Sequence, residues 1–132
     1  MKKLEYRVLY VEKQKNDYYL TRGYIMADGH YFPCVSGKYG RGTIPLGEYE
    51  IKPVIELKDD GKSLAYKRDG KPWYAPLIPI GKCEDSKGDR TGLAIHPDGN
   101  IEGTLGCIGI TDNDDMLFDI MRRTKFEKLI VI

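Results

Sequence analysis

A histidine and a cysteine lie close together in the glycine-rich segment GLAIHPDGNIEGTLGCIGI, residues 92–110. His96 ends an apolar run, and Cys107 follows eleven positions later (96 to 107) in a Gly-Cys pair. A cysteine attacks as its thiolate, whereas a free thiol near neutral pH is mostly protonated. A neighbouring imidazole can take that proton and return it to a leaving group. The pair therefore predicts nucleophilic catalysis, with a small buried cysteine as the alternative.

Such chemistry needs further groups, and the same segment offers candidates for them. Gly106 permits the close approach of a substrate carbonyl, and the backbone N–H groups near Gly106 and Cys107 could form an oxyanion hole. Either Asp98 or a backbone carbonyl near Pro97 could orient the imidazole. A metal site is not expected, because the chain has two histidines and neither a CxxC nor an HxxxH spacing.

Composition limits the classes of protein that remain. A chain of 132 residues predicts a single domain over 1–132. With 21 basic and 20 acidic residues, it lacks the positive charge expected of a nucleic-acid-binding protein. The 3 cysteines exclude a closed disulfide framework. Cys34 is expected to be buried and Cys83 exposed, and a Cys34–Cys83 disulfide is left open.

The amino-terminal segment does not have the pattern of a signal peptide. Two lysines open it, but Glu5 and Arg7 interrupt the apolar run and no small-residue cleavage site follows. No stretch of the chain is long and apolar enough for a membrane span. We therefore expect synthesis in the cytoplasm without a signal peptide.

The elements that must hold the pair are mostly strands. Alternating apolar residues predict a strand over 4–10, and Asp28-Gly29 predicts a hairpin between YLTRGYIM and YFPCVSG. Further strands are expected at 47–56, 64–67, 92–96 and 128–132. The Asp-Gly pairs within 58–62 and 68–71 predict two more hairpin turns, and the polar stretch 81–90 an exposed loop.

One segment, 112–123, predicts a helix. Thr111 or Asp112 could cap its start, acidic residues occupy its first turn, and Arg122 and Arg123 its last. The final residues, FEKLIVI, then predict a strand. The expected fold is therefore mainly β, with one C-terminal α-helix followed by a final strand.

Three motifs in this order resemble the L,D-transpeptidase (YkuD-type) catalytic domain of bacterial cell-wall enzymes. The first is the segment of His96 and Cys107, with Thr104, Leu105, Gly106 and Ile108 at the motif positions. The second is CVSGKYGRGTIPLGEYEI, which matches at Val35, Ser36, Gly37, Thr43, Pro45, Gly47, Tyr49 and Ile51, with Ile44 inserted. The third is the acidic helix and terminal apolar strand. The resemblance covers roughly 20–132 and implies a YkuD-like β-sandwich or mixed sheet.

The resemblance implies acyl transfer on peptidoglycan stem peptides. The Cys107 thiolate would attack the carbonyl of an L,D-linked bond and form a thioester, which an amine or water then resolves. Neither a metal nor an organic cofactor is needed. The implied catalytic residues are Cys107, His96 and Gly106. The implied substrate-binding residues are Thr104, Leu105, Trp73, Tyr74, Ser36 and Asp98.

Two departures leave the reaction open. Histidine is common in the family where this chain has Leu105, and Arg or Asn where it has Gly109. Transpeptidation, L,D-carboxypeptidase hydrolysis and D-amino-acid exchange remain as alternatives. A further alternative is a non-catalytic cell-wall-binding or phage structural module on the same fold.

Outside the motif, the segment GKPWYAPLIPI holds two aromatic candidates. Trp73 and Tyr74 could form a wall of a substrate cleft, or pack in the core. Three prolines there favour a loop at the edge of the cleft over a central strand. Tyr39 and Arg41 could reach a substrate carboxylate, or lie in a solvated loop. His30 is given no role.

The resemblance also carries expectations about location and partners. Compact members of the family resemble small interbacterial effectors and phage-encoded domains. Such a protein would act in the periplasm or on the cell wall, and an effector would have an immunity protein or a secretion apparatus as a partner.

Overall fold

The computed structural model describes residues 2–13, 19–37, 42–61, 63–81, 84–85, 88–89, 92–99, 104 and 107–132. These residues are mainly β, with one α-helix followed by a final strand, as the sequence predicts. The helices are α1 (Asp114–Arg123) and the 3₁₀-helix η2 (Leu64–Tyr66). The strands are β1 (Lys3–Lys13), β2 (Tyr19–Ala27), β3 (His30–Gly37), β4 (Gly47–Ile51), β5 (Ile55–Glu56), β6 (Trp73–Pro79), β7 (Glu84–Asp85), β8 (Gly88–Asp89), β9 (Leu93–Pro97), β10 (Ile108–Ile110) and β11 (Lys128–Val131).

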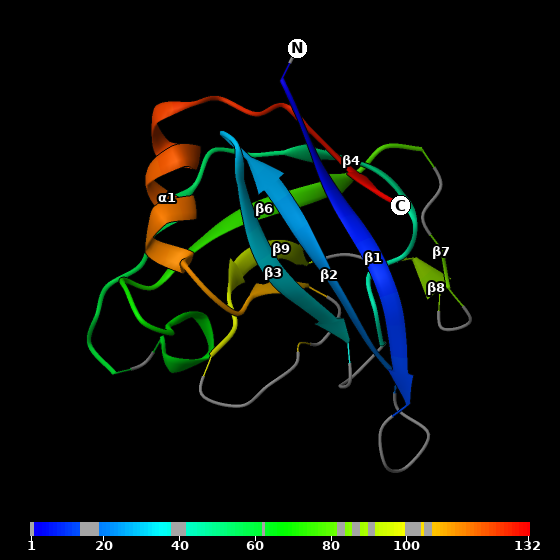
Figure 1. The fold of residues 1–132 in the computed structure, drawn as a ribbon, viewed down its shortest axis with the longest axis horizontal. Coiled ribbons are helices and arrows are strands. Elements are labelled where there is room, and N and C mark those ends of the chain that lie inside the picture. The colour runs from blue at the N-terminus through cyan, green and yellow to red at the C-terminus, as the bar shows by residue number, and fades with distance from the viewer. Residues whose placement is uncertain are drawn as a thin grey trace.

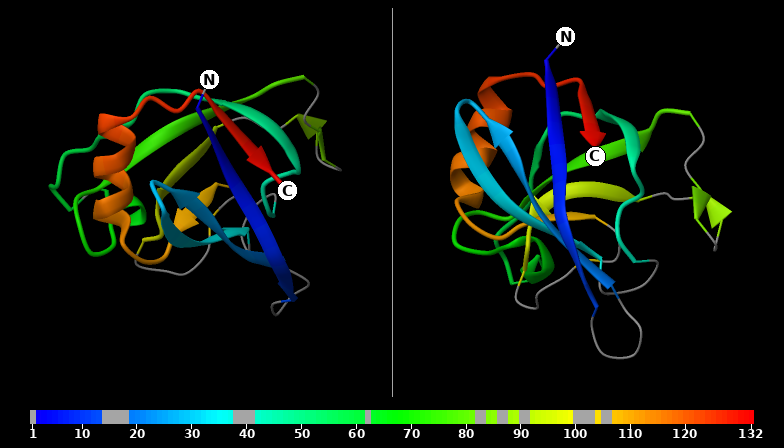
Figure 2. Two further views of the ribbon diagram at one scale, coloured as in Figure 1. Left: turned by 45° about the horizontal axis from the view of Figure 1, so that its top comes forward. Right: turned by 45° about the vertical axis from the view of Figure 1, so that its right-hand side comes forward.

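Nine of these strands form one mixed sheet in the order β4-β11-β1-β2-β3-β10-β9-β6-β5. Strand β4 also pairs with β6, so the sheet closes on itself as a barrel. The pairs β1–β11 and β9–β10 are parallel, and the other pairs of this sheet are antiparallel. Figure 1 and Figure 2 show the twisted strands surrounding a common interior, with α1 standing at one side.

The interior is filled by side chains that alternate along the strands. In β1, Leu4 and Tyr6 are buried while their neighbours are exposed. The Tyr6 hydroxyl lies 3.0 Å from Thr21 Oγ1, so the polar tip of this buried ring has a partner. Helix α1 closes the side near the start of β6, where Phe118 stacks on Trp73. The core therefore joins the helix to the barrel.

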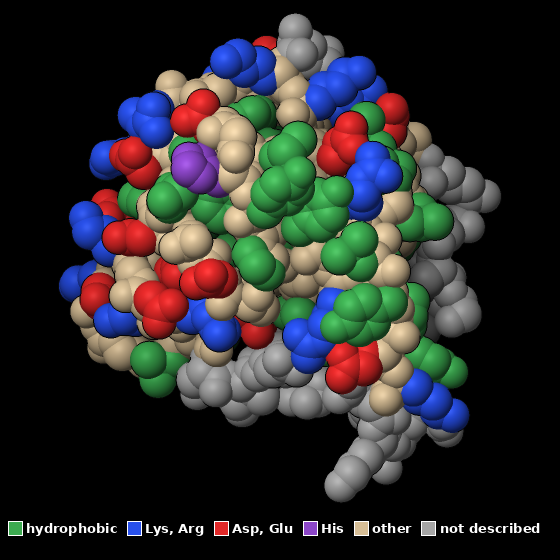
Figure 3. Space-filling view, in the orientation of Figure 1, with side chains coloured by type: hydrophobic (Ala, Val, Ile, Leu, Met, Phe, Trp, Pro, Cys, Tyr) green, Lys and Arg blue, Asp and Glu red, His purple; other side chains and the backbone are tan. Residues whose placement is uncertain are grey.

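The outward face of β1, β2 and β3 is unusually apolar. Its exposed large side chains are Leu9, Tyr10, Val11, Tyr19, Met26 and Tyr31. Hydrophobic side chains gather at the centre of the face shown in Figure 3. In the part of the chain that the structure describes, no helix is long and apolar enough to cross a membrane.

The predicted hairpin at Asp28-Gly29 is confirmed. It joins β2 to β3 with Ala27 opposite His30, and both turn residues have positive φ, 51° at Asp28 and 77° at Gly29. Such a turn matches the right-handed twist of the flanking strands, and Asp-Gly adopts it readily. This hairpin brings the end of β3 beside β10.

Several other local predictions are wrong. Residues 64–67, predicted as a strand, contain the 3₁₀-helix η2. The Asp-Gly pairs at 60–61 and 69–70 both lie in one long connection between β5 and β6, and neither forms a tight hairpin. The strand predicted over 47–56 is divided into β4 and β5. The loop predicted at 81–90 contains the small β7–β8 hairpin.

The proline-containing segment is a strand, contrary to the prediction of a loop. Strand β6 pairs with β9 on one side and with β4 and β5 on the other. Pro72 precedes the strand and Pro79 ends it, so Pro76 alone lies inside. Its carbonyl still accepts a hydrogen bond from Lys52 N at 2.9 Å. A proline that retains this bond is tolerated.

The helix begins slightly later than predicted. Its N-cap residue is Asn113, in the left-handed conformation and without a side-chain cap, rather than Thr111 or Asp112. The carboxylate of Asp112 instead accepts the N–H of Asn113 at 3.0 Å. Asp114 and Asp115, in the first turn, accept backbone N–H groups from Gly70 and Lys71. The start of α1 is thus occupied in holding the β5–β6 connection.

Candidate active site

His96 lies near the end of β9 and is almost completely buried, with 5% of its surface exposed. Its Nδ1 is 2.7 Å from the Pro97 carbonyl oxygen. A carbonyl only accepts, so this contact requires a proton on Nδ1 and leaves Nε2 unprotonated. Burial lowers the pKa of His96 to about 4, against a smaller opposite effect of the Pro97 hydrogen bond. His96 is therefore neutral at neutral pH.

Cys107 immediately precedes β10 and is partly exposed. It is a free cysteine, and its Sγ lies 3.7 Å from the Gly92 carbonyl oxygen, to which the thiol donates. Cys34, the other free cysteine in the described part of the chain, is buried, and its thiol donates to the Phe32 carbonyl at 3.0 Å. Burial raises the pKa of Cys34 far above that of an ordinary thiol. Of these two thiols, Cys107 is the accessible one.

Strand pairing brings the start of β10, which Cys107 immediately precedes, beside β9, which carries His96. In the parallel β9–β10 pair, Gly109 lies opposite His96. Cys107 itself lies outside β10, two residues before Gly109. The aromatic ring of Tyr66 packs against His96, and partial burial, with smaller contributions from the charges of Cys107 and Tyr74, raises the pKa of Tyr66. Both chemical groups therefore border Tyr66.

Thr104 ties the cysteine to β3. Its Oγ1 accepts the Gly37 N–H at 3.1 Å and donates to the Cys107 carbonyl at 2.6 Å. Its own N–H donates to the Gly37 carbonyl at 2.7 Å. Thr104 is 5% exposed in this structure. Its hydroxyl is thus used to fix the backbone at Cys107.

Asp98 is fully buried below the same strands. Its carboxylate lies 3.9 Å from Arg68 Nη1, and its N–H donates to the Ile110 carbonyl at 2.8 Å. A Cβ on Gly109 would lie 2.9 Å from Asp98 Oδ1, so a larger residue there would displace the carboxylate. Residue 109, where the family often has Arg or Asn, is glycine here, and Asp98 packs against it. Of the two groups expected to orient His96, the Pro97 carbonyl is the one placed at Nδ1.

Ser36 lies beneath the site and has no exposed surface. Its Oγ accepts the Ile44 N–H at 2.8 Å, and it pairs with Ile108 across β3 and β10. These contacts attach the chain after β3 to the strand that follows Cys107. Ser36 is placed to support the site from below.

The two aromatic candidates separate in the structure. Trp73 has no exposed surface and stacks on Phe118, with ring centroids 5.9 Å apart, so it packs in the core. Tyr74 is half-buried, and its ring lies 6.0 Å from that of Tyr66. Of the two, only Tyr74 lies on the side of Tyr66 and His96.

Tyr66 is the residue that the sequence interpretation missed. Its ring meets the His96 imidazole edge-on, with centroids 4.5 Å apart and an angle of 87° between the planes. The prediction of a strand over 64–67 concealed it, and the turn-forming residues on both sides were the available signal of an irregular segment. Leu105, Gly106, Tyr39, Arg41 and Cys83 lie outside the described residues.

No group of three or more His, Cys, Asp or Glu within the described ranges is placed to hold a metal ion. The described residues instead offer a partly exposed thiol before β10, a neutral imidazole on β9, and an aromatic ring that packs on this imidazole. Such a set can transfer a proton and form a covalent acyl intermediate.

Comparison with protein families gives one match. The family model of the L,D-transpeptidase catalytic domain, YkuD, matches residues 5–125, nearly the whole chain. No curated protein and no solved structure matches.

Proposed function

The chain belongs to the YkuD family of L,D-transpeptidase catalytic domains, and from this premise we propose that Cys107 and His96 perform acyl transfer or hydrolysis on peptidoglycan stem peptides. The observation that supports the proposal is that a partly exposed free thiol immediately precedes β10, while a neutral imidazole lies on β9, the strand that pairs with β10. Family membership indicates a peptidoglycan-directed activity in general, and the two residues supply a route for it.

The proposed route begins with a neutral pair. His96, with a pKa of about 4, cannot hold the thiol proton in the resting enzyme, because an ordinary cysteine thiol has a pKa of about 8.5. The Cys107 proton therefore passes to His96 Nε2 as Sγ attacks the substrate carbonyl carbon. The C–S bond forms, and the carbonyl π electrons move to oxygen. Transfer coupled to attack avoids a separate uphill step.

Collapse of the tetrahedral intermediate completes the first half-reaction. The C–N bond breaks, the proton on His96 passes to the leaving amine, and the acyl group remains on Cys107 as a thioester. An acceptor amine or water then gives a proton to His96 and attacks the thioester; the C–S bond breaks, and His96 returns the proton to Sγ, which restores the Cys107 thiol. We propose the backbone N–H groups of Gly106 and Cys107 as oxyanion donors. The route requires no metal or organic cofactor.

The neighbours receive supporting roles in this proposal. The carbonyl of Pro97 keeps the His96 proton on Nδ1. Thr104 fixes the backbone at the nucleophile. Tyr74 is the aromatic candidate for substrate contact, and Leu105 is proposed to line the pocket. The substrate implies action in the periplasm or on the cell wall.

The test is mass spectrometry of purified muropeptides after incubation with wild type, Cys107→Ala or Cys83→Ser. Loss of a terminal D-alanine indicates hydrolysis, an exchanged residue indicates D-amino-acid exchange, and a cross-linked dimer indicates transpeptidation. We expect one of these products with wild type and Cys83→Ser, and none with Cys107→Ala. If wild type binds the muropeptides but leaves them unchanged, the proposed enzymatic function is wrong and the protein is a binding module. Activity that survives Cys107→Ala would contradict the mechanism.

A further inference from the structure

The ring of Tyr66 covers the His96 imidazole from outside the barrel. The centroids are 4.5 Å apart and the planes nearly perpendicular, which is a favourable edge-to-face geometry. Tyr66 is 36% exposed while His96 is 5% exposed. The tyrosine therefore stands between the imidazole and solvent.

Tyr66 belongs to the connection between β5 and β6, residues 57–72, which we call the 57–72 segment. It rests against the chain that follows β9 at a point where a side chain would not fit. A Cβ on Gly99 would lie 2.5 Å from the Leu64 carbonyl oxygen and 2.6 Å from that of Ala65. Residue 99 must therefore be glycine for η2 to pack where it does. This close backbone contact determines how near η2, and with it the Tyr66 ring, lies to His96.

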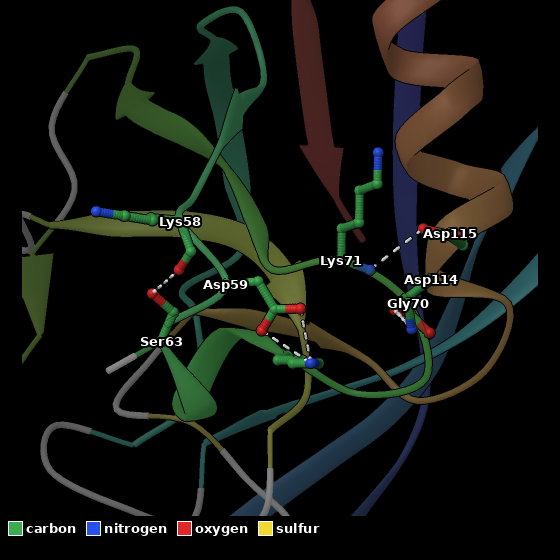
Figure 4. A network of polar contacts seen from close by, with 8 residues as sticks. Lys58, Asp59, Ser63, Gly70, Lys71, Asp114 and Asp115 are labelled. Atoms are coloured by element: carbon green, nitrogen blue, oxygen red, sulfur yellow. Dashed lines mark hydrogen bonds and ion pairs between the residues drawn. The ribbon is translucent and has the colours of Figure 1, made fainter. Parts of the chain in front are cut away.

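Side-chain contacts fix the rest of the 57–72 segment. Arg68 Nη1 donates to the Asp98 carbonyl oxygen at 3.4 Å, and Lys67 Nζ contacts both carboxylate oxygens of Asp59 at 2.8 and 2.9 Å. The Gly70 N–H donates to Asp114 Oδ2 at the start of α1, at 3.1 Å. Figure 4 shows the contacts of Asp59 and those of Gly70 and Lys71 with the start of α1. The segment is thus fixed on both sides of Tyr66.

Within the described part of the chain, the imidazole has one hydrogen-bond partner, the Pro97 carbonyl at Nδ1. One hydrogen bond fixes one ring atom but leaves the plane of the ring free to tilt about it. The perpendicular ring of Tyr66 supplies the second constraint. Among the described residues, the titratable group in contact with the His96 ring is Tyr66, whose ring is followed by that of Tyr74. Asp98 follows β9 and lies 3.9 Å from Arg68 Nη1, and Cys107 precedes the partner strand β10.

We propose that Tyr66 is a positioning residue for His96: its ring fixes the plane of the imidazole and keeps water from it, so that Nε2 stays a proton acceptor for Cys107. The inference rests on the proposed function, and it assigns this task to the ring of Tyr66 rather than to its hydroxyl. Burial is the main reason that the pKa of His96 is low, so removal of the ring should raise that pKa toward its ordinary value.

The test compares Tyr66→Phe with Tyr66→Ala. Tyr66→Phe keeps the ring, and we expect wild-type activity and the wild-type acid limb of the pH–rate profile. Tyr66→Ala should lower kcat roughly tenfold, from the loss of an aromatic contact, and move the acid limb upward by about a unit or more. Equal losses in both variants would overturn the inference, because the hydroxyl would then be the acting group.

A second readout does not depend on turnover. The chain has two histidines, and the exposed His30 gives a reference signal beside that of His96 in an NMR titration. We expect the His96 titration to move upward in Tyr66→Ala and to stay in place in Tyr66→Phe. If the His96 titration in Tyr66→Ala stays where it is in wild type, the inference is overturned even if wild type is active. Conversely, a shift in a protein that leaves muropeptides unchanged supports the inference while rejecting the proposed function.

Tyr66→Leu provides for the case in which Tyr66→Ala does not fold. It retains apolar volume without an edge-on ring, so it should keep His96 partly shielded but let the imidazole tilt. We expect kcat to fall while the His96 titration moves less than in Tyr66→Ala. Wild-type kcat in Tyr66→Leu would contradict the role of the ring.

Discussion

The two sides of His96 are built by different kinds of interaction. On the β10 side, backbone pairing joins β9 to β10 and β10 to β3, and Thr104 adds hydrogen bonds to Gly37 and Cys107. On the other side, the 57–72 segment has only the short η2 and is held by ion pairs, a glycine contact and bonds to α1. The proposed nucleophile thus directly precedes a strand of the barrel, whereas Tyr66 belongs to the 57–72 segment, which packs against the barrel.

This difference has a physical consequence for motion. Regions held by buried backbone pairing open with nearly the free energy of global unfolding, whereas irregular segments with exposed contacts open more readily. We infer that the backbone pairing beside Cys107 opens less readily than the side-chain contacts that hold the 57–72 segment over His96. Changes on the two sides should therefore affect stability and activity differently.

The largest expected effect is on the pH dependence of the free energy of unfolding, and it comes from His96, which is buried between the β10 side and the 57–72 segment. Its pKa is about 4 in the folded chain and ordinarily about 6.5, so the unfolded state binds more protons between these values. The free energy of unfolding contributed by His96 is fully present above pH 6.5 and falls by on the order of 3 kcal/mol as the pH drops to about 4. Urea unfolding across this range should show a steeper decline in wild type than in His96→Phe. Equal declines would mean that the imidazole is not buried as described.

Thr104→Val tests the barrel side. The valine keeps the shape but removes the hydroxyl that joins Gly37 to Cys107. We expect the free energy of unfolding to fall by about 1–3 kcal/mol, because two buried backbone groups lose a partner. Denaturant midpoints measure this, and Thr104→Ser, which keeps the hydroxyl, serves as the matched control. A valine variant as stable as the serine variant would remove the distinction between the two sides.

Gly99→Ala tests the 57–72 segment and should have the smallest effect on global stability. The new Cβ would push η2 away through its backbone carbonyls, and the segment can move without opening the barrel. We expect a change in the free energy of unfolding below about 1 kcal/mol, since the segment contributes no barrel pairing. Hydrogen exchange should increase at Lys67 N and remain unchanged at Asp98 N, which bonds to Ile110. Equal increases at both amides would show that the segment and the barrel open together.

The sequence predicted the elements whose signals are local. The Asp28-Gly29 hairpin depends on a turn that these residue types favour, and the helix depends on an apolar face that its packing requires. The position of His96 near the end of a strand was likewise readable. These predictions hold because neighbouring residues decide them.

The predictions that are wrong depended on distant partners. The short apolar run at 64–67 was taken for a strand, but its conformation follows from contacts with Gly99 and Asp98, which are far away in sequence. Strand β6 contains Pro76 because pairing on both sides outweighs the one missing donor. The same reason explains why Tyr66 was missed as a neighbour of His96: no local pattern announces it.

The parallel pairing of β1 with β11 also governs how the chain can be assembled during translation. The partner of Leu4 is Leu129, so the first strand emerges from the ribosome almost the whole described length before the strand that it adjoins. Until β11 is made, β1 can pair only with β2, and β4 lacks β11, the strand that lies between β4 and β1. Contacts so far apart in sequence slow folding. A nascent chain would consequently hold an open sheet until its last strand is made.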